Sequence, residues 1–278
     1  MKTTINCFIP FANAAQAEKT VQSLQSSDLI KKIYLLTTET TATPLPGCDI
    51  LTVSALNSSA TMRAVATHSD ADYTLLYTKY TTLSPGMFAF ERMIHIAKDS
   101  NAGMVYADHY QVAEGVQKNA PVIDYQPGSL RDDFNFGSVL LYKASALKEA
   151  VSRMKADYQF AGLYDLRLKL SQKEALVHIN EYLYSEVEND TRKSGEKIFD
   201  YVDPKNRGLQ IEMEQACTEH LKEIGGYLAP EFKKIEFSAG NFEYEASVII
   251  PVRNRIRTIR DAIRSVLNQK TDFKFNLI

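Results

Sequence analysis

The chain has 278 residues, of which 45% are hydrophobic and 24% charged, and its net charge is −2 at pH 7. This composition is ordinary for a globular protein, and the small net charge gives no electrostatic case for binding nucleic acid or an anionic surface. No apolar run is long enough to span a membrane, and Pro10 comes too early for a signal peptide, so we expect a cytoplasmic protein. Three widely spaced cysteines without metal-ligand spacing are expected to be reduced, structural thiols: Cys7, Cys48 and Cys217.

Apolar, β-prone runs alternate with amphipathic helical stretches along most of the chain. This alternation predicts an α/β domain with a mostly parallel sheet flanked by helices. Ligands of such sheets bind beyond the carboxyl ends of the strands, so we expect chemistry just after each strand. The expected strands are residues 5–11, 32–38, 49–53, 72–77, 104–107, 137–142 and 176–183. The expected helices are a stretch ending at Ser26, residues 58–67, a helix starting at residues 84–86, and residues 144–154, 164–170 and 210–224; residues 115–127 are read as a loop and 186–206 as a surface linker.

The pattern that opens the chain returns at its end. Residues 5–13 and 246–254 both read as a buried strand followed by a Pro-x-x-Asn turn, and each leads into a helix and a second strand. The second copy stops at Ile278, so we expect a fragment of a longer two-domain protein. A single helix between two short strands buries too little surface to fold alone. Residues 246–278 should therefore dock on the rest of the chain or self-associate with another copy through exposed strand edges.

Several segments, in order, resemble those of bacterial family-2 glycosyltransferases with the GT-A fold. The strand-Pro-x-x-Asn start is similar to the opening of these proteins, and residues 72–85 resemble their "YILFLDxDDxLSP" segment. Residues 105–108 resemble the family's "vYsD" strand end, and Phe136-Gly137-Ser138 before an apolar strand also fits. The resemblance covers residues 4–187 and begins again at 246. It implies a GT-A-like glycosyltransferase domain at 1–187, a helical connector at 188–245, and the start of a second, truncated glycosyltransferase domain at 246–278.

The resemblance implies a hexosyltransferase-type enzyme that moves a sugar from a nucleotide-sugar donor to a glycan acceptor in surface polysaccharide synthesis. The expected location is the cytoplasm, including the inner face of the membrane. In the family, an Asp-x-Asp pair after the fourth strand holds Mg²⁺ or Mn²⁺, which neutralises the diphosphate as it leaves. Here Thr78, Lys79 and Tyr80 occupy those positions. We therefore expect no metal site or other cofactor in this part of the chain, and a divalent cation only in a continuation of the second domain.

Two further positions depart from the family pattern. Where the family has an acidic pair that holds the nucleoside, this chain has two threonines followed by Glu39. The family's general base would stand at Gly162 and Leu163, and the nearby Asp165 is the remaining catalytic candidate. Asp108 and His109 follow the fifth strand, where they could bind a metal or a sugar hydroxyl. The candidate nucleotide-sugar-binding residues are Pro10, Asn13, Glu39, Arg63, Lys79, Asp108 and His109.

Each candidate also has a structural interpretation. Asn13 could simply cap the following helix, Lys79 could be a solvated loop lysine, and Arg63 could pair with a nearby acid. His178, inside an apolar strand, reads as a core histidine with satisfied ring nitrogens. Two hypotheses thus stand for the first domain. It is a metal-independent transferase that uses Lys79 and Arg63 on the diphosphate, or a catalytically inactive GT-A-like module that binds glycan or scaffolds a downstream catalytic domain; the lost acidic residues favour the second.

Overall fold

A computed structural model describes residues 2–188, 207–234 and 242–278. The chain divides into two compact units, which we call the first unit (Met1–Tyr227) and the second unit (Leu228–Ile278). The domain limits expected near residues 187 and 245 remain predictions. Among the described helices, none has the length and apolar character needed to cross a membrane.

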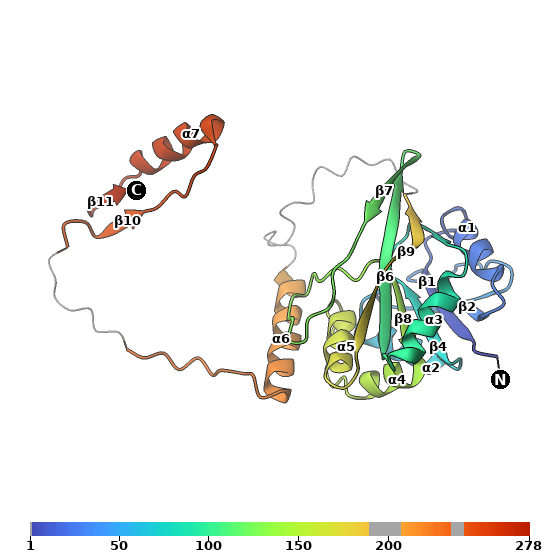
Figure 1. The fold of residues 1–278 in the computed structure, drawn as a ribbon. Coiled ribbons are helices and arrows are strands. Elements are labelled where there is room, and N and C mark those ends of the chain that lie inside the picture. Colours follow the sequence, from blue (N-terminus) through green and yellow to red (C-terminus); the bar gives the residue numbers. More distant parts are fainter. Residues whose placement is uncertain (1, 189–206, 235–241) are drawn as a thin grey trace. The chain divides into compact units, whose positions relative to one another are not determined.

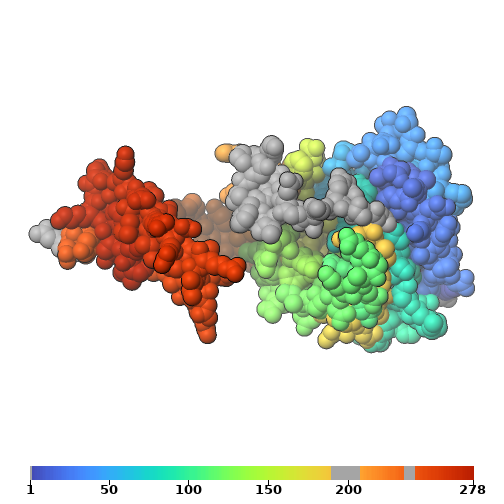
Figure 2. Space-filling model, turned by 90° about the horizontal axis from the view of Figure 1, so that it is seen from above, coloured from blue at the N-terminus to red at the C-terminus, as the bar shows by residue number. Residues whose placement is uncertain are grey.

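The first unit is built on a nine-stranded sheet in the order β3-β2-β1-β4-β8-β6-β9-β5, with β7 paired to β6 (Figure 1). Its inner strands are mostly parallel, whereas β5, β7 and β8 run antiparallel to their neighbours. The predicted α/β class is therefore confirmed. Figure 2 views the chain from above, the side toward which β6 and its hairpin with β7 point. The strands are Ile5–Pro10 (β1), Ile30–Thr37 (β2), Cys48–Thr52 (β3), Tyr73–Tyr77 (β4), Thr82–Pro85 (β5), Met104–Ala113 (β6), Val116–Ala120 (β7), Val139–Lys143 (β8) and Leu176–Val187 (β9).

Helices cover both faces of this sheet. Buried side chains of α1 and α3 pack on one face, and those of α2, α4 and α5 pack on the other. A sixth helix, α6, packs against α5 rather than against the sheet. The helices are Ala14–Gln25 (α1), Ser59–His68 (α2), Ala89–Asp99 (α3), Ala144–Ser152 (α4), Gly162–Ser171 (α5) and Arg207–Glu223 (α6).

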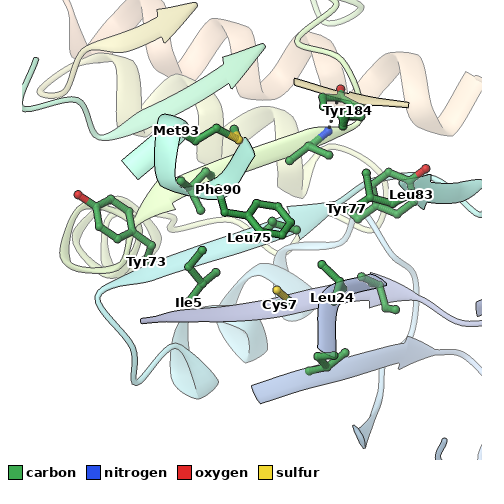
Figure 3. Packing of buried hydrophobic residues seen from close by; sticks show 14 of the residues in the cluster. Ile5, Cys7, Leu24, Tyr73, Leu75, Tyr77, Leu83, Phe90, Met93 and Tyr184 are labelled. Atoms are coloured by element: carbon green, nitrogen blue, oxygen red, sulfur yellow. Dashed lines mark hydrogen bonds between the residues drawn. The ribbon is translucent and has the colours of Figure 1, made fainter. Parts of the chain in front are cut away.

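The core follows from the alternation of side chains along each strand. Ile5 and Cys7 of β1 point to the α1–α3 face, and Phe8 points to the other. On the first face, Leu24 of α1 and Phe90 of α3 belong to the cluster drawn in Figure 3. Fully burying one such aliphatic or aromatic side chain contributes about 1.5–3 kcal/mol. This packing fixes the strands whose carboxyl ends carry the candidate site.

All three cysteines are free. Cys7 and Cys48 lie on β1 and β3, and Ile33 of β2 stands between them in the sheet register. Burial raises the pKa of the Cys7 thiol strongly and raises the pKa of Cys48 to about 11. Both thiols therefore stay protonated near neutral pH, which suits a packing role.

The structure differs from the expected elements at three places. Residues 84–86, expected to begin a helix, contain the end of β5, which pairs antiparallel with β9. Pro85 is tolerated there because β5 is the last strand of the sheet. Part of the loop expected at 115–127 is β7. Glu186, expected to open a surface linker, is a buried residue of β9, and the part of that linker from 189 to 206 lies outside the described residues.

The second unit contains the predicted strand-helix-strand. Its strands Ala246–Val248 (β10) and Phe275–Leu277 (β11) pair in parallel, and Ile256–Leu267 forms the helix α7 between them. None of the residues of α7 is fully buried. The expected element types are thus confirmed for this segment, whereas its self-association stays a prediction.

Candidate functional site

Four side chains from three strands or strand ends meet at the carboxyl edge of the first unit's sheet. Lys79 lies two residues after the end of β4, His109 lies in β6, and Tyr184 and Glu186 lie in β9. The Lys79 ammonium lies 2.8 Å from Glu186 Oε1 and 3.1 Å from Oε2. His109 Nε2 lies 3.8 Å from Glu186 Oε2, and its ring stacks on Tyr184 with centroids 5.0 Å apart. We call these four residues the strand-end cluster.

The cluster mixes one reachable charge with buried groups. The Lys79 side chain is 45% exposed, whereas that of Glu186 is only 6% exposed. The pKa of His109 is lowered, chiefly by burial; Lys79 also lowers it, and Glu186 opposes them by raising it. The ring is therefore neutral at pH 7. Lys79 is therefore the cation that compensates the buried Glu186 carboxylate. Among the described residues, neither ring nitrogen of His109 has a hydrogen-bond partner.

Backbone groups beside the cluster are held in place by Tyr184. Its hydroxyl accepts hydrogen bonds from the backbone N–H groups of Ser138 at 2.9 Å and Val139 at 3.3 Å. Gly137 just before them has φ +75°, and a Cβ there would lie 2.5 Å from the Tyr184 hydroxyl and 3.4 Å from His109 Nδ1. Only glycine fits this close approach without strain. The Gly-Ser pair singled out in the sequence therefore shapes the wall of the cluster.

The first candidates in the chain lie beside this edge in structural roles. Asn13 caps α1, since its side-chain oxygen accepts from the Gln16 N–H at 3.0 Å, as the capping interpretation predicts. Gln16 Nε2 in turn donates to the Tyr80 carbonyl at 2.9 Å, which ties the start of α1 to the loop after β4. Pro10 is buried at the end of β1, and Glu39 is exposed beyond the end of β2.

Two roles were considered for Arg63, contact with the diphosphate and pairing with a nearby acid, and the structure shows the pairing. Its guanidinium pairs with Asp157 and donates to the carbonyls of Met154 at 3.2 Å and Ala156 at 3.0 Å. These contacts hold the segment after α4 against α2. The structure therefore does not bring Arg63 to the strand-end cluster, where a diphosphate would need it.

Asp108 and His109 do not act as a pair, because neighbouring residues of a strand point to opposite faces. Asp108 is buried, and its Oδ1 accepts from the Val122 N–H at 2.8 Å and lies 2.9 Å from His178 Nε2. The other ring nitrogen of His178 lies 2.7 Å from Asp124 Oδ1. His178 is thus the satisfied histidine that the sequence predicts, and His109 alone belongs to the strand-end cluster.

Asp165 is placed away from the strand ends. Its side chain is 1% exposed and faces α6, and the Lys169 ammonium lies 3.7 Å from Oδ1. At that separation the contact is an ion pair and not a hydrogen bond. Burial raises the pKa of Asp165 to about 6, with Lys169 lowering it and Glu219 and Glu223 raising it. Covered in this way, Asp165 cannot reach an acceptor hydroxyl in this structure.

A cavity of about 150 Å³ lies between α5, α6 and the segment that precedes β8. Leu163, at the position matched to the general base, lines it. The Arg167 guanidinium lies 4.8 Å from the Tyr164 ring centroid, and both residues line the same cavity. Asp132 is the one carboxylate of that lining. The wall is otherwise mostly aromatic and aliphatic.

Two site residues escape the sequence prediction. Both Tyr184 and Glu186 are missed because their strand was expected to end at 183. The signal that could have extended the strand is the presence of aromatic and β-branched residues beyond 183, at Tyr184 and Val187. Among the described residues, no group of three or more His, Cys, Asp and Glu side chains could hold a metal ion. Whether the site takes up a cation stays a prediction.

No protein-family model matches the chain, and no curated protein matches its sequence. Its fold does match solved structures of TarS from S. aureus. The structure of TarS 1–349 in complex with UDP-GlcNAc matches with a TM-score of 0.50 and 11% identity, over 79% of this chain and 72% of that chain. The structure in complex with UDP matches with a TM-score of 0.51 and 8% identity, over 79% and 65%.

Two further TarS matches, both with a TM-score of 0.48 and 9% identity, span 60% of the TarS 1–349 chain and 37% of the TarS chain. Identities this low show the fold alone. The first unit therefore has the predicted GT-A-like fold, a mostly parallel sheet flanked by helices.

Proposed function

We propose that the chain belongs to a nucleotide-sugar-dependent glycosyltransferase and that the strand-end cluster is its candidate donor site in the first unit. The observation that carries this is the position of Lys79, a reachable cation at the carboxyl end of β4. The fold shared with TarS, which was crystallised with UDP-GlcNAc and with UDP, supports a uridine nucleotide as the first donor to test. A hexosyl group, a glycan acceptor, a bacterial surface polysaccharide as product and a cytoplasmic location belong to the same proposal.

In this proposal Lys79 takes the place of a metal ion. An ammonium is a compact point charge that can stabilise the diphosphate as the glycosidic bond to the leaving group breaks. The Gln16–Tyr80 contact holds the loop that carries Lys79, so the charge is positioned by the fold. We assign no general base, because Asp165 is buried against α6 and Leu163 stands at the matched position.

A second candidate function is a catalytically inactive module that binds glycan or supports a catalytic domain elsewhere. The observation that favours it is the Lys79–Glu186 pair, which neutralises the charge that a diphosphate would meet. The buried Asp165 points the same way. On this hypothesis the first unit keeps the fold of a transferase but does not catalyse sugar transfer.

Titration calorimetry of the whole chain with UDP, UDP-GlcNAc and other nucleoside diphosphates separates the two functions. We expect UDP to bind without added Mn²⁺ or Mg²⁺, and Lys79→Ala to weaken binding by about 1–3 kcal/mol, the range for a charge-assisted hydrogen bond. Lys173→Ala is the matched control, because Lys173 is also half-exposed and paired, with Glu149 at 2.8 Å, but lies two residues after the end of α5. No binding by any nucleotide would leave the inactive module, and binding that depends on Mn²⁺ would contradict the role of Lys79.

A further inference from the structure

Glu186 has a feature that the proposed donor site alone does not require. A transferase that uses Lys79 on a diphosphate needs the ammonium to be available, yet both carboxylate oxygens of Glu186 lie within 3.1 Å of it. Glu186 is nearly fully buried, so it has little water to replace a lost partner. A buried carboxylate without a cation is strongly disfavoured.

Within the described part of the chain, the surroundings of Glu186 offer no substitute for Lys79. The other basic group that faces it is His109, at 3.8 Å, and this ring is neutral at pH 7. Two further titratable neighbours in the described ranges are the hydroxyls of Tyr77 and Tyr184, whose pKa values burial and Glu186 both raise, so they stay uncharged. An anion that draws Lys79 away therefore leaves an uncompensated charge behind.

From this geometry we infer that Glu186 is a specificity-determining residue, which sets the charge of the site by holding Lys79. This inference rests on the proposed donor function of the same site. The wild-type cluster presents one positive and one negative charge, so an anionic ligand has to share Lys79 with Glu186. The site should therefore favour a nucleoside diphosphate over its nucleoside by less than a free Lys79 would allow, and removing the charge of Glu186 should increase that preference.

Glu186→Gln is the variant that tests this, because it keeps the shape and can still accept a hydrogen bond from Lys79. We expect it to bind UDP about tenfold more tightly than wild type, as one freed charge interaction allows. Binding of uridine, which carries no phosphate, should not change. The gain for UDP should shrink as salt is added, because Lys79 is half-exposed and its charge is screened. The double variant Lys79→Ala/Glu186→Gln, which leaves no buried charge unpaired, should lose the gain.

A ligand-free measurement separates failure of this inference from failure of the proposed function. Competitive labelling with acetic anhydride, read by mass spectrometry, should modify Lys79 faster in Glu186→Gln than in wild type, with Lys173 as the internal reference. If neither protein binds UDP but Lys79 is labelled faster, the donor function fails and the charge control by Glu186 stands. Equal UDP affinities in wild type and Glu186→Gln would overturn the inference, and so would equal labelling when neither protein binds UDP.

Discussion

The strand-helix-strand at the start of the chain and the one at its end share a pattern and differ in burial. In β1 all six residues are buried, and α1 buries Ala17, Thr20, Val21 and Leu24. In β10 no residue is fully buried, and the same holds for α7. Both copies nevertheless form parallel strand pairs joined by a 12-residue helix. Local sequence is therefore enough to specify these elements, and burial depends on something else.

The difference lies in the neighbours of each copy. β1 pairs with β4 on its far side and β2 pairs with β3, so the first copy sits inside a sheet. Among the described residues, β10 and β11 pair only with each other. A two-stranded sheet is at best marginally stable, because it has few places to bury an apolar face. The comparison teaches that this motif becomes a core only when more strands extend it.

The two copies also sit in regions of different charge. Residues 246–278 contain seven Lys and Arg against two Asp and Glu, a net charge of +5 in a chain whose total is −2. All nine of these charged side chains are exposed. The first unit instead buries several charged groups: Asp108, Asp165, Lys169 and Glu186. We therefore expect packing and titration to affect stability in the first copy's unit far more than in the second.

The largest expected contrast comes from the same substitution in the last turn of both helices. Leu24 of α1 is 0% exposed, so Leu24→Ala should destabilise the first unit by about 2–5 kcal/mol, through lost transfer energy and the cavity left behind. Leu267 of α7 is 62% exposed, and Leu267→Ala should change stability by no more than about 0.5 kcal/mol. Urea unfolding followed by far-UV circular dichroism measures both. Comparable losses would mean that α7 is covered in solution.

The strands that were not predicted also depend on their neighbours in the sheet. The pattern from 5 to 77 predicted β1 to β4 well, because each strand is short, apolar and flanked by turn residues. β5 could not be predicted from Thr82 to Pro85, since what makes it a strand is its pairing with β9, about a hundred residues later. β7 has five residues of which four are exposed, and only its hairpin with β6 identifies it.

The candidate site was predictable in part. The carboxyl end of β4 and the substitution of Lys79 for an acidic residue could be read from the chain. Glu186 could not, because it is separated from Lys79 by 107 positions and comes near it through the antiparallel pairing of β5 with β9, in which Leu83 lies opposite Glu186. The alternation of side chains along β6 separates Asp108 from His109 by placing them on opposite faces. Asp165 was a reasonable candidate by position, but it lies away from the strand ends and is buried where α6 packs on α5.

The next contrast compares a buried carboxyl group with an exposed one in the pH dependence of stability. The folded pKa of Asp165 is about 6, above its ordinary value of 3.8, so the folded first unit binds this proton more tightly than the unfolded chain does. The resulting stability is fully present below pH 3.8 and is lost as pH rises through about 6, by about 2–3 kcal/mol in total.

Asp165→Asn should therefore flatten the stability profile between pH 4 and 7 and raise stability at neutral pH. Lys169 keeps a partner in this variant, since Glu223 lies 2.6 Å away. Asp261→Asn, on the exposed surface of α7, is the matched control and should leave the profile as it is in wild type. Urea midpoints at several pH values measure the effect, and an unchanged slope in Asp165→Asn would show that another group controls it.

The smallest contrast is at the asparagines that end the two Pro-x-x-Asn turns. Asn13 has φ −163° and caps α1 with its side chain, so Asn13→Ala should cost about 1 kcal/mol, whereas Asn13→Ser should keep the cap. Asn254 has φ +55°, and α7 has no side-chain cap at its first turn. At Asn254 serine and alanine should both cost about 1 kcal/mol, because the left-handed backbone disfavours them, while Asn254→Gly should cost nothing. Urea unfolding reports the loss in α1, and amide exchange at the first turn of α7 reports the loss there. If serine is tolerated equally at both positions, the two turns are alike in solution and the contrast between the copies does not extend to their helix starts.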